Sequence, residues 1–175
     1  MLALKSLNYL IYYYMETIMI KIAEKLPEVT FSLRQNGNAS NPTTSELFAG
    51  KKVVLFAVPG AYTPTCSNAH LPGYIALADK FVAKGVDNII CLSVNDAFVM
   101  EAWGKTQNAE DILMLADGGG EFTRAIGLDK ETGAFGGVRS IRYAMLVEDG
   151  IVKVVNVEAP GKFEVSDAQT MLATL

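Results

Sequence analysis

Apolar runs of strand length recur along the chain from Pro27 onward. Three of them are continuously apolar, which is typical of strands buried on both faces of a sheet. An earlier segment alternates apolar and polar residues as a half-buried strand does, and the polar stretch after it predicts a loop. Asp149-Gly150 separates the last two runs and indicates a β-hairpin. The predicted strands are 29–33, 52–58, 88–93, 112–116, 142–147 and 151–157, and the predicted loop is 35–44.

Segments with helical spacing lie between these strands. Thr63-Pro64 predicts a helix start, because Thr is a good N-cap and Pro fits the first helical position. Pro72-Gly73 predicts a kink or an interruption of that helix. The alternation of strands and helices, with a late antiparallel hairpin and a closing helix, indicates an α/β protein with a mixed sheet. This order of elements is that of a thioredoxin-like arrangement, but the motif around Cys66 is needed to identify that fold. Further helices are predicted from Asn95 or Asp96, over 122–126, and over 166–175 with Ser166 as the cap.

Residues 1–18 have a different pattern from the rest of the chain. They are apolar and rich in tyrosine, but Lys5, Asn8 and Glu16 interrupt the apolar runs. The stretch is therefore too broken for a membrane span, and it lacks the small-residue cleavage site of a signal peptide. We interpret it as an extension outside the domain, which then covers 19–175. A membrane-surface or targeting helix is the alternative.

Composition narrows the classes of function. The 175 residues suit one domain, and half of them are hydrophobic, which is ample for a buried core. A net charge of −4 and the absence of a basic run argue against nucleic acid and against stable membrane association. Two cysteines and one histidine are too few for a disulfide framework or a Cys/His metal site. We therefore expect no metal or other cofactor, and a cytoplasmic location.

The chemically informative segment surrounds Cys66. A buried strand ends at Val58, a turn follows, and Cys66 becomes the third residue of the predicted helix. At that position the free N–H groups and the helix dipole stabilise an anion, so the thiol ionises to the nucleophilic thiolate more readily. Local pattern alone leaves a buried structural cysteine as an equal alternative.

Pro59, Thr63 and Cys66 have the spacing P-x-x-x-T-x-x-C, the signature of peroxiredoxins. The segments PGAYTPTCSNAHLPGY, CLSVNDAFVMEAW and RYAMLVEDGIVKVVNVE resemble the type II, or peroxiredoxin-5, subgroup. The resemblance extends over about 22–175. It implies a thioredoxin-like fold, a homodimer, and an antioxidant thiol peroxidase that reduces hydrogen peroxide and organic hydroperoxides.

The resemblance also assigns roles to residues. Cys66 matches the peroxidatic cysteine, whose thiolate attacks peroxide and becomes sulfenic acid. Thr63 matches the threonine that aligns thiolate and peroxide, and Pro59 the proline that shields the cysteine from water. Arg142 matches the arginine that stabilises thiolate and departing oxygen. Alternatives remain open: Thr63 as a cap only, Pro59 as a turn residue, Arg142 as a surface ion-pair partner, and Arg139 as the matching arginine.

Three further residues carry weaker expectations. His70 lies one helical turn after Cys66 and is interpreted as a helix-packing residue. Phe135 matches an aromatic residue that walls the peroxide pocket, with core packing as the alternative. Cys91 lies within an apolar strand, which predicts a buried, inert thiol.

No cysteine follows Cys91, whereas some family members have a resolving cysteine nearer the C-terminus. This departure points to a one-cysteine cycle in which glutathione, glutaredoxin or thioredoxin reduces the sulfenic acid. A disulfide oxidoreductase would need Cys-x-x-Cys, and Thr63 stands where its first cysteine belongs. A redox sensor or a chaperone-like binding protein that uses the same cysteine remains the alternative function.

Overall fold

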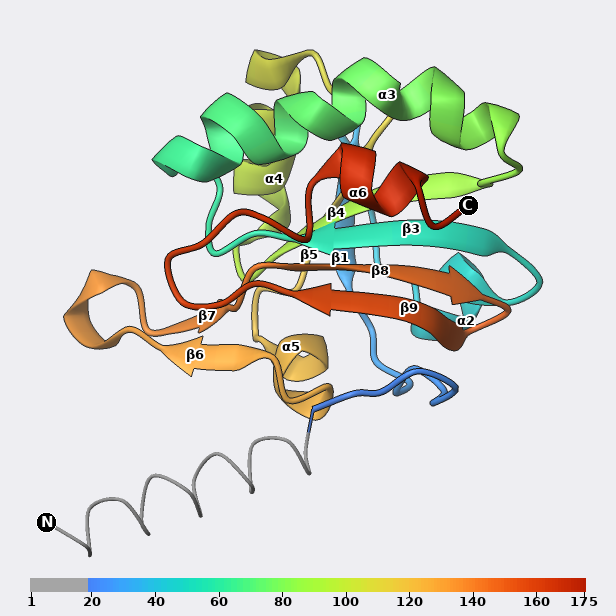
Figure 1. The fold of residues 1–175 in the computed structure, drawn as a ribbon. Helices are drawn as coiled ribbons and strands as arrows, with labels where there is room; N and C mark the ends of the chain where they lie inside the picture. The colour runs from blue at the N-terminus through green and yellow to red at the C-terminus, as the bar shows by residue number, and fades with distance from the viewer. Residues whose placement is uncertain (1–18) are drawn as a thin grey trace, which may run out of the picture.

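A mixed β-sheet forms the centre of the molecule. The computed structural model describes residues 19–175 (Figure 1), and in this range a seven-stranded sheet has the order β2-β1-β5-β4-β3-β8-β9. Its strands are β1 (Ser32–Gln35), β2 (Asn38–Ser40), β3 (Lys52–Ala57), β4 (Asn88–Ser93), β5 (Leu113–Ala116), β8 (Tyr143–Glu148) and β9 (Ile151–Val157). The central strands β3, β4 and β5 run parallel, and the neighbours on either side pair antiparallel. This arrangement confirms the predicted α/β fold class with a mixed sheet.

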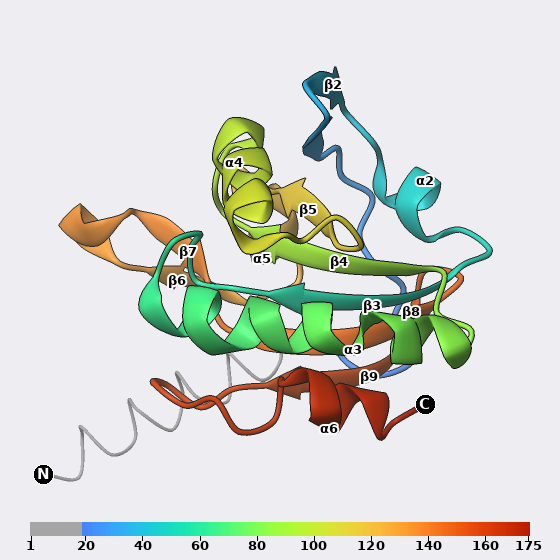
Figure 2. The same ribbon diagram turned by 90° about the horizontal axis from the view of Figure 1, so that it is seen from above.

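Helices cover both faces of the sheet (Figures 1 and 2). Alternate residues of β3 point to opposite faces, so Val54 and Phe56 join one core cluster while Val53 and Leu55 join the other. Within residues 19–175, three α-helices pack on the first face and two on the second. The first three are α3 (Leu71–Ala83), α4 (Ala97–Gln107) and α6 (Ala168–Leu172), and the other two are α2 (Thr44–Phe48) and α5 (Glu121–Ala125).

The late hairpin forms as predicted. Asp149 and Gly150 both have positive φ, 50° and 74°, as a two-residue type I′ turn requires, and Glu148 pairs with Ile151 across it. The early part of the chain differs from the prediction. Asn36 and Gly37, at φ 52° and 82°, form a second hairpin turn, so the predicted loop contains β2 and the first strand starts later, at Ser32.

The helix after β3 also differs from its prediction. Pro72 does not interrupt it: residues 64–65 are helical, the turn η1 (Cys66–His70) is π-helical, and α3 continues from Leu71. The Leu71 N–H donates to the Cys66 carbonyl, five residues back. This wider turn makes room for a proline ring that would strike the carbonyl four residues earlier in a regular α-helix.

Two C-terminal details were not predicted. Asp167, not Ser166, caps α6 by accepting a hydrogen bond from the Thr170 amide. Between α5 and β8, the strands β6 (Asp129–Glu131) and β7 (Val138–Ser140) form a separate hairpin around the 3-10 turn η2 (Gly133–Phe135). Within 19–175 no helix is long and apolar enough to cross a membrane. The interpretation of 1–18 as an extension lies outside the described residues.

Candidate active site

Cys66 lies in the first turn of the helix that follows β3. The Val58 amide still donates to the Leu92 carbonyl of β4, and helical structure begins at Pro64, so Cys66 is the third helical residue. The Ala61 amide donates to the Asn95 side chain at 3.0 Å, which ties the intervening turn to the next strand's end. The Cys66 side chain has no exposed surface. The thiol therefore sits at a fixed place, beneath the surface and at the start of a helix.

A guanidinium group lies against this sulfur. Arg142 directly precedes β8, and β8 pairs with β3 so that Tyr143 lies opposite Ala57. This pairing brings Arg142 to the end of β3, where its Nη2 donates to the Cys66 Sγ at 3.3 Å. An arginine stays protonated, and a fixed cation beside a sulfur stabilises negative charge there. Within 19–175 no carboxylate lies at ion-pair distance from Arg142.

Arg139, the alternative to Arg142 in the sequence, has other partners. Its Nη1 donates to the Val94 carbonyl at 3.1 Å, and its side chain lies next to Gly60 and Gly136. A Cβ on Gly136 would come within 2.6 Å of the guanidinium, so the absence of a side chain there lets Arg139 pack against the backbone. Arg142, and not Arg139, contacts the Cys66 sulfur.

Thr63 and Pro59 frame the turn before the helix. The Thr63 side chain does not cap the helix, because its hydroxyl donates to the Gly60 carbonyl at 2.8 Å. Its own carbonyl accepts from the Ser67 amide, which starts the helical hydrogen bonding. Pro59 is half-buried between β3 and this turn. Both residues lie within one short segment leading to Cys66.

Phe135 lies elsewhere. It belongs to η2 in the β6–β7 hairpin, which projects from the main sheet (Figure 1), and its side chain is 79% exposed. In the described chain it is neither a core residue nor a hydrogen-bonded neighbour of Cys66. A role in binding the peroxide stays a prediction.

His70 does more than pack. It is wholly buried, and the centroid of its ring lies 4.9 Å from that of Phe56 and 5.0 Å from that of Phe163. Its Nδ1 also lies 2.9 Å from Nη1 of Arg142, and its Nε2 lies 3.1 Å from the Ser166 carbonyl. Sequence reasoning missed this link to the arginine. The spacing of one helical turn from Cys66 was the available signal.

Cys91 occupies the middle of β4, where it pairs with Phe56 of β3 and Met114 of β5. Burial raises the pKa of its thiol well above the ordinary value, and the nearby Cys66 sulfur adds to the rise. The expectation of a buried thiol is confirmed, and its raised pKa keeps it protonated and weakly nucleophilic.

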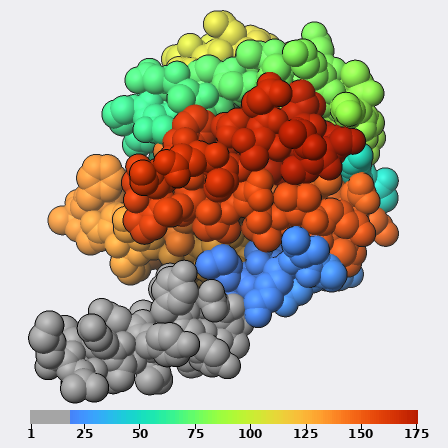
Figure 3. All heavy atoms as spheres, in the orientation of Figure 1, coloured from blue at the N-terminus to red at the C-terminus, as the bar shows by residue number. Residues whose placement is uncertain are grey.

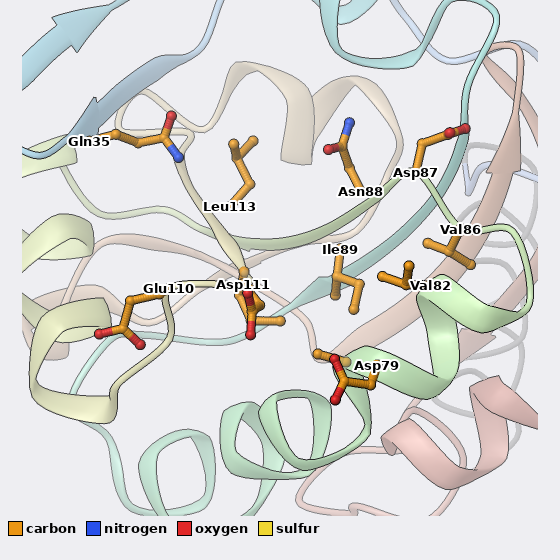
Figure 4. Close-up of a pocket in the computed structure, with 12 residues that line it drawn as sticks. Gln35, Asp79, Val82, Val86, Asp87, Asn88, Ile89, Glu110, Asp111 and Leu113 are labelled. Atoms are coloured by element: carbon orange, nitrogen blue, oxygen red, sulfur yellow. The ribbon is translucent and has the colours of Figure 1, made fainter.

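A separate cavity of about 230 Å³ lies between α3, the start of β4 and the segment before β5 (Figure 4). Asp79, Asp87, Glu110 and Asp111 line it, and none of the residues around Cys66 does. Carboxylates would oppose rather than stabilise a thiolate, so this cavity is not the place for thiol chemistry.

A single buried cysteine at a helix start, with a guanidinium on its sulfur, is typical of a thiol nucleophile, and its turn lacks the second cysteine of a dithiol–disulfide exchanger. The comparisons with known proteins identify the family. The Redoxin family model matches residues 21–172. Over 167 residues the chain is 49% identical to "Peroxiredoxin-2E, chloroplastic" of Arabidopsis thaliana, covering 91% of this chain and 70% of that protein.

Solved structures agree with this match. Reduced Prx3 of Vibrio vulnificus in complex with H2O2 has 60% identity and a TM-score of 0.87, covering 89% of this chain and 99% of that one. Peroxiredoxin 5 of Alvinella pompejana has 39% identity and a TM-score of 0.78, covering 89% and 97%. The chain belongs to the type II peroxiredoxins. It has their thioredoxin-like fold, and its activity is that of an antioxidant thiol peroxidase.

Proposed function

We propose that Cys66 is the peroxidatic nucleophile and that Arg142, Thr63 and Pro59 are its catalytic partners. The observation that carries this assignment is the 3.3 Å contact between Nη2 of Arg142 and the Cys66 sulfur. The contact places a permanent cation where the thiolate charge lies before reaction and close to where charge develops on the peroxide. A peroxide complex of the similar Vibrio protein supports hydrogen peroxide as a substrate.

The first step is a displacement at oxygen. The Cys66 thiolate attacks one peroxide oxygen, an S–O bond forms, the O–O bond breaks, and the second oxygen leaves and takes up a proton as water or an alcohol. The cysteine is thereby oxidised to sulfenic acid. Because the Thr63 hydroxyl donates its hydrogen to Gly60, its oxygen is free to accept a hydrogen bond from the O–H of the peroxide. Arg142 donates to the sulfur and to the departing oxygen.

The second part of the cycle uses an external thiol and no bound cofactor. Cys91 is the remaining cysteine, and it is buried within a strand paired on both sides. We therefore expect glutathione to condense with the sulfenic acid, forming a mixed disulfide and water. Glutaredoxin then attacks that disulfide and restores the thiol. Thioredoxin is the competing reductant.

Steady-state turnover distinguishes these reductants. Peroxide consumption is followed with glutathione plus glutaredoxin, and separately with thioredoxin and its reductase, at equal protein concentration. Faster turnover with glutathione and glutaredoxin supports the one-cysteine cycle, whereas turnover with thioredoxin alone contradicts the glutathione step. A single turnover that no thiol donor extends would instead favour the redox-sensor function.

We also propose a homodimer in the cytoplasm. Tyr62, Phe98 and Phe135 are large aromatic side chains that are 54%, 68% and 79% exposed, and such residues are enriched in interfaces. Sedimentation of the full chain tests the dimer, and a monomer at every concentration contradicts it. The low cysteine content supports a reducing compartment, although the Arabidopsis relative is named chloroplastic. Fractionation of the source cells tests the location.

A further inference from the structure

We propose that His70, held by the C-terminal loop (residues 158–166), positions the Arg142 guanidinium against Cys66. In this reading His70 and Glu158 are positioning residues: neither touches the peroxide, and both act through Arg142. The inference rests on the proposed catalytic role of Arg142. It assigns a function to a histidine that packing alone would not require to be polar.

The hydrogen-bonding partners of His70 determine its tautomer. An arginine can only donate, so the ring Nδ1 at 2.9 Å from Nη1 of Arg142 must be the acceptor. A carbonyl can only accept, so the ring Nε2 at 3.1 Å from the Ser166 oxygen carries the hydrogen. Both ring nitrogens are thus satisfied in one neutral form. The ring orientation is fixed from both ends, and with it the direction of the guanidinium.

The C-terminal loop holds the other side of this histidine. One oxygen of Glu158, Oε1, accepts hydrogen bonds at 2.8 Å from the amides of Glu164, Val165 and Ser166 and from the Ser166 hydroxyl. Tyr74 donates to the Ser166 carbonyl at 2.8 Å, next to His70. A single carboxylate oxygen therefore fixes the conformation of the C-terminal loop through four hydrogen bonds. Figures 1 and 3 show this C-terminal segment lying beside the start of α3.

Glu158 also contacts Arg142 directly. The Glu158 amide donates to the Arg142 carbonyl at 3.0 Å. Arg142 is therefore held at its backbone by Glu158 and at its guanidinium by His70, and Ser166 joins the two holding residues. The Phe163 ring of the same loop lies 5.6 Å from the guanidinium carbon. Arg142, His70, Ser166 and Glu158 come from three separate segments of the chain and form a closed ring of contacts.

A neutral acceptor suits this position better than a carboxylate. A carboxylate paired with Arg142 would offset the positive charge that the thiolate and the departing oxygen need. Burial, together with the charge of Arg142, lowers the pKa of His70 to about 3, against the opposing effects of Glu158 and Asp167. His70 therefore stays neutral in the physiological range. It directs the guanidinium without neutralising it.

Stopped-flow oxidation by hydrogen peroxide tests the proposal. Trp103, the chain's single tryptophan, donates to the hydroxyl of Ser67 beside Cys66, so its fluorescence reports on the catalytic helix. We expect His70→Leu to react roughly 100-fold more slowly, since misplacing a catalytic group by about 1 Å costs that much. His70→Asn restores an acceptor close to the position of Nδ1 and should recover at least about tenfold of the loss.

The loop is tested by variants that do not contact the guanidinium. Glu158→Gln keeps the shape but loses the charge that gathers the loop, and we expect it to react about three- to tenfold more slowly. Tyr74→Phe is the matched control. It removes the other hydrogen bond to the Ser166 carbonyl and leaves His70 in place, so we expect a rate within about threefold of wild type.

Several outcomes would overturn the inference. A wild-type rate for His70→Leu, or equal losses in folded His70→Leu and His70→Asn, would show that the acceptor does not matter. If His70→Leu fails to fold, the rates of Glu158→Gln and Tyr74→Phe test the proposal instead. Equal rates in these two variants would show that the Glu158 contacts do not position Arg142. Arg142→Ala separates the two proposals. A fast Arg142→Ala refutes the proposed catalytic role, whereas a slow Arg142→Ala beside a fast His70→Leu rejects only the positioning role of His70.

Discussion

Cys66 and Cys91 lie in the same hydrophobic cluster, and neither has any exposed surface. Their surroundings nevertheless differ in kind. Cys66 stands at the start of a helix with the Arg142 guanidinium on its sulfur, whereas Cys91 stands in a strand paired on both sides. Burial alone is therefore the same for the two thiols. In the proposed function, the guanidinium beside the Cys66 sulfur is what makes this buried thiol the nucleophile.

The position along each element explains the difference. In the middle of a β-strand, backbone amides are committed to neighbouring strands, so none is free to stabilise an anion. At a helix start the first amides lack helical partners and point toward the side chains of the first turn. The raised pKa of Cys91 includes a contribution from Cys66, because two neighbouring negative charges are unfavourable. The guanidinium lies on the Cys66 sulfur, and the raised pKa of Cys91 keeps that thiol protonated.

The largest expected effect separates the two cysteines directly. We predict that Cys66→Ser abolishes peroxidase activity, because a hydroxyl is a far weaker nucleophile, and that Cys91→Ser largely preserves it. Steady-state peroxide consumption measures both. Cys91→Ser buries a hydroxyl in an apolar strand, so a loss of about 1–3 kcal/mol in unfolding free energy is expected and must be measured alongside. Equal loss of activity in two folded variants would assign Cys91 a role in the cycle.

The next effect tests what surrounds Cys66. We predict that Arg142→Ala or Thr63→Val lowers the second-order rate with peroxide by roughly 100-fold or more, since a preorganised hydrogen-bonding group contributes about 3 kcal/mol in the transition state. Arg142 contacts the sulfur, while Thr63 holds Gly60 and offers its oxygen to the peroxide. Stopped-flow rates measure the loss, and thermal unfolding checks that each domain stays folded. Arg139→Ala is the comparison variant, because Arg139 contacts the Val94 carbonyl instead of Cys66.

Much of the fold could be predicted because its signals are local. The apolar runs mark β3, β4 and β5, and Asp149-Gly150 marks the hairpin of β8 and β9. The first hairpin was missed although Asn36-Gly37 has the same turn chemistry, because its flanking strands are short and polar. The β6–β7 hairpin was missed for a similar reason: strands of three residues carry too little alternation to recognise.

The candidate site was predictable only in part. The spacing of Pro59, Thr63 and Cys66 is local, and family resemblance supplied Arg142. The holding contacts of the arginine are not local: His70 and Arg142 are 72 residues apart in sequence, and His70 and Ser166 are 96 apart. Ser166 was expected to cap a helix, yet its amide and hydroxyl bind Glu158 and its carbonyl faces His70. No periodicity in the sequence encodes such contacts, because they depend on how distant segments meet.

Acid should lower the unfolding free energy of the domain through the protonation of His70. His70 has an ordinary pKa of 6.5 and a pKa lowered to about 3 in the fold, so the unfolded chain binds a proton between these values and the folded chain does not. The unfolding free energy is therefore unaffected by His70 above pH 6.5. Between pH 6.5 and about 3 it falls by about 1.4 kcal/mol for each unit by which the pH decreases. Between pH 7 and pH 5 we expect wild type to lose roughly 2 kcal/mol more unfolding free energy than His70→Asn.

Denaturant unfolding at the two pH values, at one protein concentration, measures this difference. Lowered pKa values at Glu158 and Asp167 also destabilise the fold in acid, but their ordinary values of 4.5 and 3.8 lie below the chosen window. Subtracting the change measured for His70→Asn from the change measured for wild type removes the remaining contribution of these two carboxylates. Equal losses of unfolding free energy in wild type and His70→Asn would mean that His70 has the same pKa in the folded and the unfolded chain, and would contradict the prediction.

The smallest change to be measured is one oxygen atom, and it decides whether the two cysteines ever meet. A disulfide needs Cα atoms within about 7 Å and side chains that point together, so a helix-start residue and a strand residue would pair only if the helix unwound. We predict that one equivalent of peroxide adds one oxygen to the chain at Cys66, and that added glutathione converts this species to a mixed disulfide. Intact-mass spectrometry with peptide mapping reads both products, and Cys91→Ser provides a control in which no internal disulfide can form. A loss of two hydrogens, mapped to a Cys66–Cys91 bond in wild type and absent from that variant, would make Cys91 the resolving cysteine, so that both thiols take part in the cycle.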